Sequence, residues 1–133
     1  MKKLLSIFVA LVLAIMCCMT AYAEMTTFAV GSEKRASTLV ISGTTATCTS
    51  QYVAANNNVS KVFITQTLEK HSFLWTWETV GGTRTKTVNG SSASLTGKVS
   101  GLASGTYRVK TVFDVTANGT TETITVYSAE KTV

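Results

Sequence analysis

The sequence predicts an all-β domain of antiparallel strands, placed behind an N-terminal export signal. After residue 37, polar and apolar residues alternate with a period of two, and the longer period of an amphipathic helix is missing. Threonine, serine and valine, which suit a pleated and half-buried surface, are abundant. Turn residues interrupt the alternation at short intervals, which is typical of a β-sandwich or a β-barrel.

The first 23 residues have the layout of a secretory signal peptide. Lys2 and Lys3 give a positive start, and residues 4–19 form an almost continuous apolar run. Ala21 and Ala23 then supply the small side chains that a signal peptidase accepts. We therefore expect cleavage after Ala23 and a secreted, extracellular protein. The short signal with its lysine start also suggests a bacterial source.

Two alternatives for this segment are a retained membrane anchor and a lipoprotein signal. The apolar run is short for a span of about 20 residues, and no basic stop-transfer cluster follows it. Cys17 and Cys18 lack the small preceding residues that lipid attachment normally needs. The expected organisation is thus a signal peptide (residues 1–23), a flexible leader (24–37) and one β domain (38–133).

Composition limits the kind of protein that is exported. The chain of 133 residues loses 23 with the signal, and the remaining 110 suffice for one domain with its own core. Loss of Lys2 and Lys3 lowers the net charge from +5 to +3, which is compatible with loose attraction to anionic wall polymers or with simple solubility. Outside the signal only Cys48 remains, so we expect a domain without an internal disulfide.

Eight strands are expected, and glycine or asparagine separates most of them. They cover residues 38–42, 45–53, 59–69, 74–80, 83–88, 93–99, 106–116 and 120–128. The first ends at Gly43, and an asparagine-rich loop precedes the third. Gly81-Gly82 is expected to turn the fourth strand into the fifth, which ends at Asn89-Gly90.

Alternation also assigns side chains to faces, because successive residues of a strand point to opposite sides. In the second strand, one face carries Ala46, Cys48, Ser50 and Tyr52. In the third strand, the inward residues are Val62, Ile64 and Leu68, and the outward residues are Lys61, Thr65, Thr67 and Glu69. In the sixth strand, one face carries Ala93, Leu95, Gly97 and Val99.

The last two strands form a hairpin around Asn118-Gly119. These residues tolerate the positive φ angles that a type I′ turn requires. The turn places Ala117 opposite Thr120 and Phe113 opposite Ile124. A slip of one residue would move the apolar side chains to different faces, so the turn and the hydrophobic pattern predict the same register.

The segment 102–107, Leu-Ala-Ser-Gly-Thr-Tyr, resembles the approach to strand F of immunoglobulin-like (Ig-like) domains. There a tyrosine at the start of the strand bonds back to the preceding corner. Two residues later, antibody domains carry their second disulfide cysteine, whereas this chain has Val109; Cys48 stands where the first would be. The resemblance implies a single antiparallel Ig-like β-sandwich of about seven to eight strands, without its cross-link.

A second resemblance extends over most of the chain after the signal. It is carried by Thr67–Lys70, Trp75, Trp77, Ser104–Lys110, Asn118-Gly119, Glu122 and Tyr127-Ser128. These residues resemble a group of small secreted proteins of clostridia and related Gram-positive bacteria. The resemblance implies a small secreted β domain and brings no activity with it.

Residues suited to catalysis or metal binding are sparse. His71 is the only histidine and Asp114 the only aspartate, and neither lies in a nucleophile-elbow motif or a cluster of metal ligands. Glu69 and Glu78 flank an expected hairpin and could approach as a carboxylate pair, although solvated strand faces explain them more simply. Cys48 is expected to be a small buried hydrophobe. We therefore expect no enzyme activity, no cofactor and no metal.

Two sets of residues are candidates for a ligand surface. Trp75 and Trp77 are two positions apart in an expected strand and could form one platform for sugar rings or flat apolar ligands. The simpler expectation is that at least one of them packs in the core, like the tryptophan on strand C of Ig-like domains. Lys61, Arg108 and Lys110 are expected outward on neighbouring strands, as a basic stripe for an acidic polymer or as a solvated face.

These observations predict a secreted, non-enzymatic binding or structural module that acts at or beyond the cell surface. Its expected partner is a cell-wall polymer, a glycan or another extracellular protein. Nucleic acid is not expected, membrane contact is expected only through the signal peptide before cleavage, and the protein is expected to be a monomer. The alternative is a secreted effector, such as an antimicrobial protein or an inhibitor of another protein. Exposure of both tryptophans favours sugar binding, whereas a protruding loop favours an inhibitor.

Overall fold

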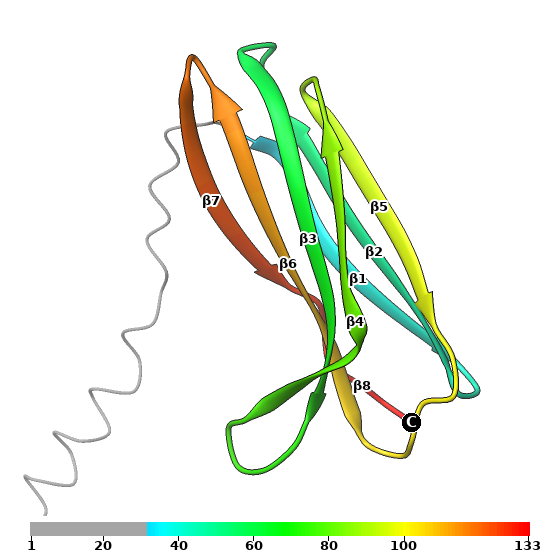
Figure 1. The fold of residues 1–133 in the computed structure, drawn as a ribbon. Coiled ribbons are helices and arrows are strands. Elements are labelled where there is room, and N and C mark those ends of the chain that lie inside the picture. Colours follow the sequence, from blue (N-terminus) through cyan, green and yellow to red (C-terminus); the bar gives the residue numbers. More distant parts are fainter. Residues whose placement is uncertain (1–31) are drawn as a thin grey trace, which may run out of the picture.

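A computed structural model describes residues 32–133, and it confirms the predicted all-β class (Figure 1). The strands are β1 (Ser32–Ser42), β2 (Thr45–Ala54), β3 (Val59–His71), β4 (Trp77–Val88), β5 (Ser92–Val99), β6 (Thr106–Ala117), β7 (Thr120–Tyr127) and β8 (Lys131–Thr132). The expected signal peptide and the first part of the expected leader lie outside the described residues. Within residues 32–133, no helix is long and apolar enough to cross a membrane.

Two antiparallel sheets form the sandwich. One has the strand order β1-β2-β5, and the other has the order β4-β3-β6-β7, with β8 paired to the start of β6. These orders correspond to strands A-B-E and C′-C-F-G of an Ig-like sandwich. The chain passes from one sheet to the other between β2 and β3, between β4 and β5, and between β5 and β6, and Figure 1 shows the two layers face to face.

The predicted boundary between leader and domain was wrong. Strand β1 begins at Ser32, so residues 32–37 belong to the sandwich and not to a flexible leader. Arg35 is paired with Tyr52 of β2, and Ser37 with Ser50. The charges of the segment 33–35 suggested a solvated tail, but the backbone ladder with β2 depends on main-chain groups and tolerates charged side chains at the edge of a sheet.

The predicted turn at Gly81-Gly82 was also wrong, because β4 is a single strand through both glycines. The pairing with β3 shifts here, from Thr67 opposite Thr83 to Leu68 opposite Val80, so the glycines form a bulge. Their φ angles are 70° and 78°, which favour glycine. A Cβ added to Gly81 would also lie 2.8 Å from a methyl carbon of Val99.

The C-terminal hairpin and the tyrosine corner have the predicted geometry. Phe113 is paired with Ile124, and the turn residues Asn118 and Gly119 have φ angles of 51° and 77°. Tyr107 is buried, and its hydroxyl donates a hydrogen bond of 2.6 Å to the carbonyl of Ala103. This is the bond to the preceding corner that the Ig-like resemblance implied.

The interior contains two hydrophobic clusters with a polar layer between them. Tyr52, Ile64 and Phe113 belong to one cluster, and Cys48, Leu68 and Val109 belong to the other. Between these residues on β2, β3 and β6 lie the fully buried side chains of Ser50, Gln66 and Thr111.

A chain of hydrogen bonds joins the polar layer. Gln66 Nε2 donates to Ser50 Oγ at 2.8 Å and to the carbonyl of Leu95 at 3.1 Å. Ser50 Oγ and Thr111 Oγ1 are 2.7 Å apart, and Thr111 Oγ1 donates to Ser37 Oγ at 2.9 Å. The layer therefore links β1, β2, β3, β5 and β6 across the space between the sheets.

Candidate functional site

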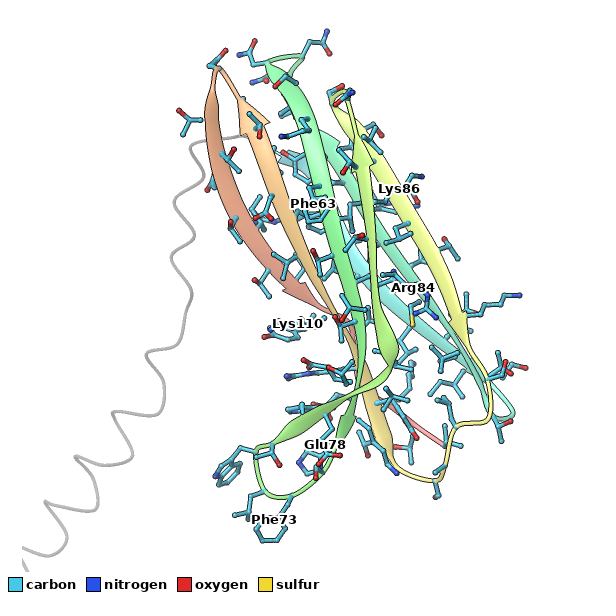
Figure 2. The ribbon with its side chains drawn as sticks, in the orientation of Figure 1. Phe63, Phe73, Glu78, Arg84, Lys86 and Lys110 are labelled. Atoms are coloured by element: carbon cyan, nitrogen blue, oxygen red, sulfur yellow. The ribbon has the colours of Figure 1, made fainter. Side chains whose placement is uncertain are left out.

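The connection between β3 and β4 projects beyond the end of the sandwich, with Phe73 at its tip (Figure 2). The structure corrects the expected strand at 74–80, because residues 72–76 form a loop and β4 begins at Trp77. Within the loop, the backbone N–H of Thr76 donates to the carbonyl of Phe73 at 2.9 Å. The N–H of Ser72 donates to the carbonyl of Thr76 at 3.0 Å.

Side chains hold the same loop. Thr76 Oγ1 donates to the carbonyl of Phe73 at 2.6 Å and accepts from the N–H of Phe73 at 3.0 Å. His71 Nε2 donates to the carbonyl of Leu74 at 2.5 Å. Leu74 has a positive φ of 52°, which the surrounding bonds hold in place. The projecting loop thus has one defined shape.

Both candidate tryptophans lie at this end of the molecule and outside the core. Trp75 is 87% exposed in the loop, and Trp77 is half-buried on the outer face of its sheet. The expectation that at least one tryptophan packs in the core was therefore wrong, and so was the expectation that both lie in one strand. Hydrophobic side chains of neighbouring strands, such as Leu68 and Tyr107, fill the core at this end.

The two tryptophans nevertheless line one open pocket, of about 440 Å³. Its lining residues are His71, Leu74, Trp75, Trp77, Thr106 and Glu130. They come from the end of β3, the following loop, the start of β4, the start of β6 and the segment between β7 and β8. Thr106 and Glu130 were not predicted, because only the fold brings these distant segments together.

Stacking on Arg108 fixes the orientation of Trp77. The guanidinium carbon of Arg108 lies 3.9 Å from the centroid of the Trp77 ring and 4.3 Å from that of Tyr127. Arg108 Nε also donates to Glu69 Oε2 at 2.8 Å. The rings of His71 and Trp77 make an edge-to-face contact, with their centroids 5.2 Å apart. Cation–π contacts of this kind orient a ring and leave less freedom to lose when a ligand binds.

The predicted basic stripe is divided in the structure. Strands β3 and β6 are neighbours as expected, but Lys61 lies opposite Thr116, whereas Arg108 lies opposite Glu69. These positions are eight residues apart along β3, about 26 Å at 3.3 Å per residue. The charge of Arg108 is also neutralised by its ion pair with Glu69. Of the three cations of the expected stripe, only Lys110 therefore lies near Arg108. Arg108 instead contacts the rings of Trp77 and Tyr127.

The candidate acid–base pairs are separated as well. Glu78 lies opposite Lys70 and Glu69 opposite Thr79, so the two carboxylates point to opposite faces of the sheet. Glu69 binds Arg108, and Glu78 accepts a bond of 2.7 Å from Ser72 Oγ. Within residues 32–133, no group of three or more His, Cys, Asp or Glu residues is placed to hold a metal ion.

His71 and Asp114 lie near opposite ends of β3. Asp114 is paired with Phe63, which is eight residues and about 26 Å from His71 along the strand. Asp114 instead accepts a hydrogen bond of 2.5 Å from Thr123. Cys48 is a buried free cysteine, and burial raises the pKa of its thiol while the nearby Arg84 charge opposes that shift. Of His71, Asp114 and Cys48, only His71 lines the pocket beside the loop.

No protein-family model matches the sequence, and no curated protein matches it. Among solved structures, the chain is similar to wild-type OgpA from Akkermansia muciniphila, at 12% identity and a TM-score of 0.39 over 77% of this chain. It is also similar to catalytically inactive OgpA in complex with an O-glycopeptide substrate, at 11% identity and a TM-score of 0.40 over 80% of this chain. The matches span 30% and 31% of the OgpA chains, and they carry no argument about the chemistry of this protein.

Proposed function

We propose that this protein is an exported, non-catalytic binding module whose ligand is a glycan. The binding site is the pocket beside the β3–β4 loop. The proposal rests on one observation, which is that Trp75 and Trp77 both lie outside the core and line the same open pocket.

The chemistry of the pocket suits a sugar ring. The flat indoles offer apolar surface to the C–H face of a ring, while Thr106 and Glu130 supply a hydroxyl and a carboxylate for its hydroxyl groups. Trp77 is held on Arg108 before any ligand arrives, so little order has to be gained on binding. Glu130 also makes the pocket a poor site for a strongly anionic polymer.

Binding to purified wall glycans, measured at about 0.1 M and about 1 M salt, tests this proposal, because the Debye length falls from about 10 Å to about 3 Å over this range. Stacking on tryptophan should survive the high salt. Trp75→Ala should abolish binding without loss of stability, because the side chain is 87% exposed. Phe73→Ala is the matched control, since Phe73 is an exposed aromatic residue of the same loop that does not line the pocket.

Charge-driven binding would give the opposite pattern. It would fade at high salt, persist in Trp75→Ala and weaken in Lys61→Glu or Lys110→Glu. That result, or the absence of binding to every glycan fraction, would reject the glycan site.

The second candidate is a secreted effector that inhibits another protein. The observation that favours it is the projecting β3–β4 loop, whose internal hydrogen bonds give it one shape, as a loop that inserts into a partner requires. Capture of one extracellular protein by the wild type and not by Phe73→Ala, together with no glycan binding, would favour this function.

A further inference from the structure

The tip of the β3–β4 loop carries three consecutive exposed apolar side chains, and the first of them, Phe73, lies outside the glycan pocket. Phe73 is 70% exposed, Leu74 is 59% exposed and Trp75 is 87% exposed. Phe73 does not line the pocket, and Figure 2 shows it at the outermost point of the loop. Of the five large apolar side chains that are exposed in residues 32–133, three lie in this one loop. Clustered apolar exposure of this kind marks a contact surface.

We propose that this tip inserts shallowly into a lipid bilayer. The residues that enter the apolar region are Phe73 and Leu74, with Trp75 at the level of the headgroups. The proposal goes beyond the glycan-binding function and does not depend on it, because Phe73 is its main determinant.

The hydrogen bonding of the loop backbone favours a lipid over a protein as the partner. A protein surface can supply hydrogen bonds to a loop, whereas hydrocarbon cannot, so inserted backbone groups have to be satisfied within the chain. Here the carbonyl of Phe73 accepts two bonds from Thr76, and its N–H donates to Thr76 Oγ1. The carbonyl of Leu74 accepts from His71. Three of the four backbone groups of Phe73 and Leu74, the residues proposed to enter the apolar region, are therefore bonded within the loop.

The distribution of charge fits the same partner. Residues 72–76 read Ser-Phe-Leu-Trp-Thr and contain no charged side chain. The nearest charges in the sequence are Lys70 and Glu78, one on each strand below the loop and of opposite sign. The tip is neutral and apolar, and the charges of Lys70 and Glu78 on the adjoining strand ends cancel. The tip should therefore bind bilayers whatever the charge of their headgroups. Tryptophan beside phenylalanine and leucine is also the combination found at the membrane interface.

Vesicles test the proposal directly. The probe is a phosphatidylcholine vesicle, alone or with anionic phosphatidylglycerol, and the protein is the processed chain beginning at Glu24. Co-sedimentation and a blue shift of tryptophan emission should appear with both compositions and persist at about 1 M salt. Phe73→Ser should weaken partitioning roughly ten- to hundredfold, the equivalent of withdrawing one apolar side chain from a nonpolar phase.

The control variant is Val40→Ser, which removes an apolar side chain that is 57% exposed on β1 and should leave vesicle binding unchanged. Circular dichroism should show that both variants are folded. Lack of binding to either vesicle, equal binding by Phe73→Ser, or binding that requires anionic lipid and disappears in salt would overturn the proposal. Because Phe73→Ser leaves the pocket intact, its binding to glycan separates failure of this proposal from failure of the proposed function.

Discussion

The buried polar layer of the sandwich gives a prediction whose size follows from the structure. Ser50→Ala removes a hydroxyl that bonds Gln66 Nε2 at 2.8 Å and Thr111 Oγ1 at 2.7 Å. All three side chains are fully buried, so water cannot replace the lost bonds. Each partner keeps one other bond, Gln66 to the Leu95 carbonyl and Thr111 to Ser37, which limits the loss.

The expected cost is about 2 kcal/mol, because a buried polar group that loses a partner costs about 1–3 kcal/mol. That is a large share of the roughly 5–15 kcal/mol that stabilises a small domain, and it should lower the melting temperature by roughly 8–16 °C. Urea unfolding should show a lower midpoint with an unchanged slope. Ser94→Ala, which removes an exposed hydroxyl from β5, is the control and should shift the midpoint little.

A second mutation separates hydrogen bonding from packing. In a Gln66→Met background the amide donor is gone, so Ser50→Ala should cost less than in the wild type, by about 1 kcal/mol. If Ser50→Ala is neutral, or if its cost is the same in both backgrounds, the layer does not stabilise the sandwich through the bonds described here.

The remaining predictions concern the corner, the free thiol and export. Tyr107→Phe removes the bond to the Ala103 carbonyl, and because Ala103 is exposed and water can replace the donor, it should cost only about 1 kcal/mol in urea unfolding; no change would argue against the tyrosine corner. Burial raises the pKa of the Cys48 thiol above its ordinary value of 9.0, so the unfolded chain loses this proton at a lower pH than the folded domain does. The thiol therefore leaves the stability unchanged well below pH 9 and lowers it as the pH rises above that value. Unfolding between about pH 8 and about pH 10 should therefore show a shallower loss of stability in Cys48→Ala than in the wild type, and equal losses would contradict this. Mass spectrometry of the culture medium should find a chain that starts near Glu24, whereas a full-length or lipid-modified chain confined to membranes would contradict export.

The sequence by itself determined the faces of the strands and one register. Alternation put Ser50 on the same face as Cys48 and Tyr52, and all three are buried. The Asn118-Gly119 turn determined the pairing of Phe113 with Ile124. Both depend on the geometry of neighbouring residues along one chain, which a sequence displays directly. The Gly81-Gly82 bulge was misread because a glycine pair has the same local signature in a turn and inside a strand.

Only the tertiary structure decided which side chains meet. Arg108 was predicted to point outward from its sheet, and it does so in the structure. Its partners Glu69, Trp77 and Tyr127, however, lie on three other strands and could not be predicted. The pocket likewise combines the β3–β4 loop with Thr106 and Glu130. Such contacts depend on the order and twist of the strands and on the relative position of segments far apart in the chain. No local sequence pattern indicates which distant segments come together. The sequence therefore identified the tryptophans as candidates, and only the fold showed that they lie together at one end of the sandwich.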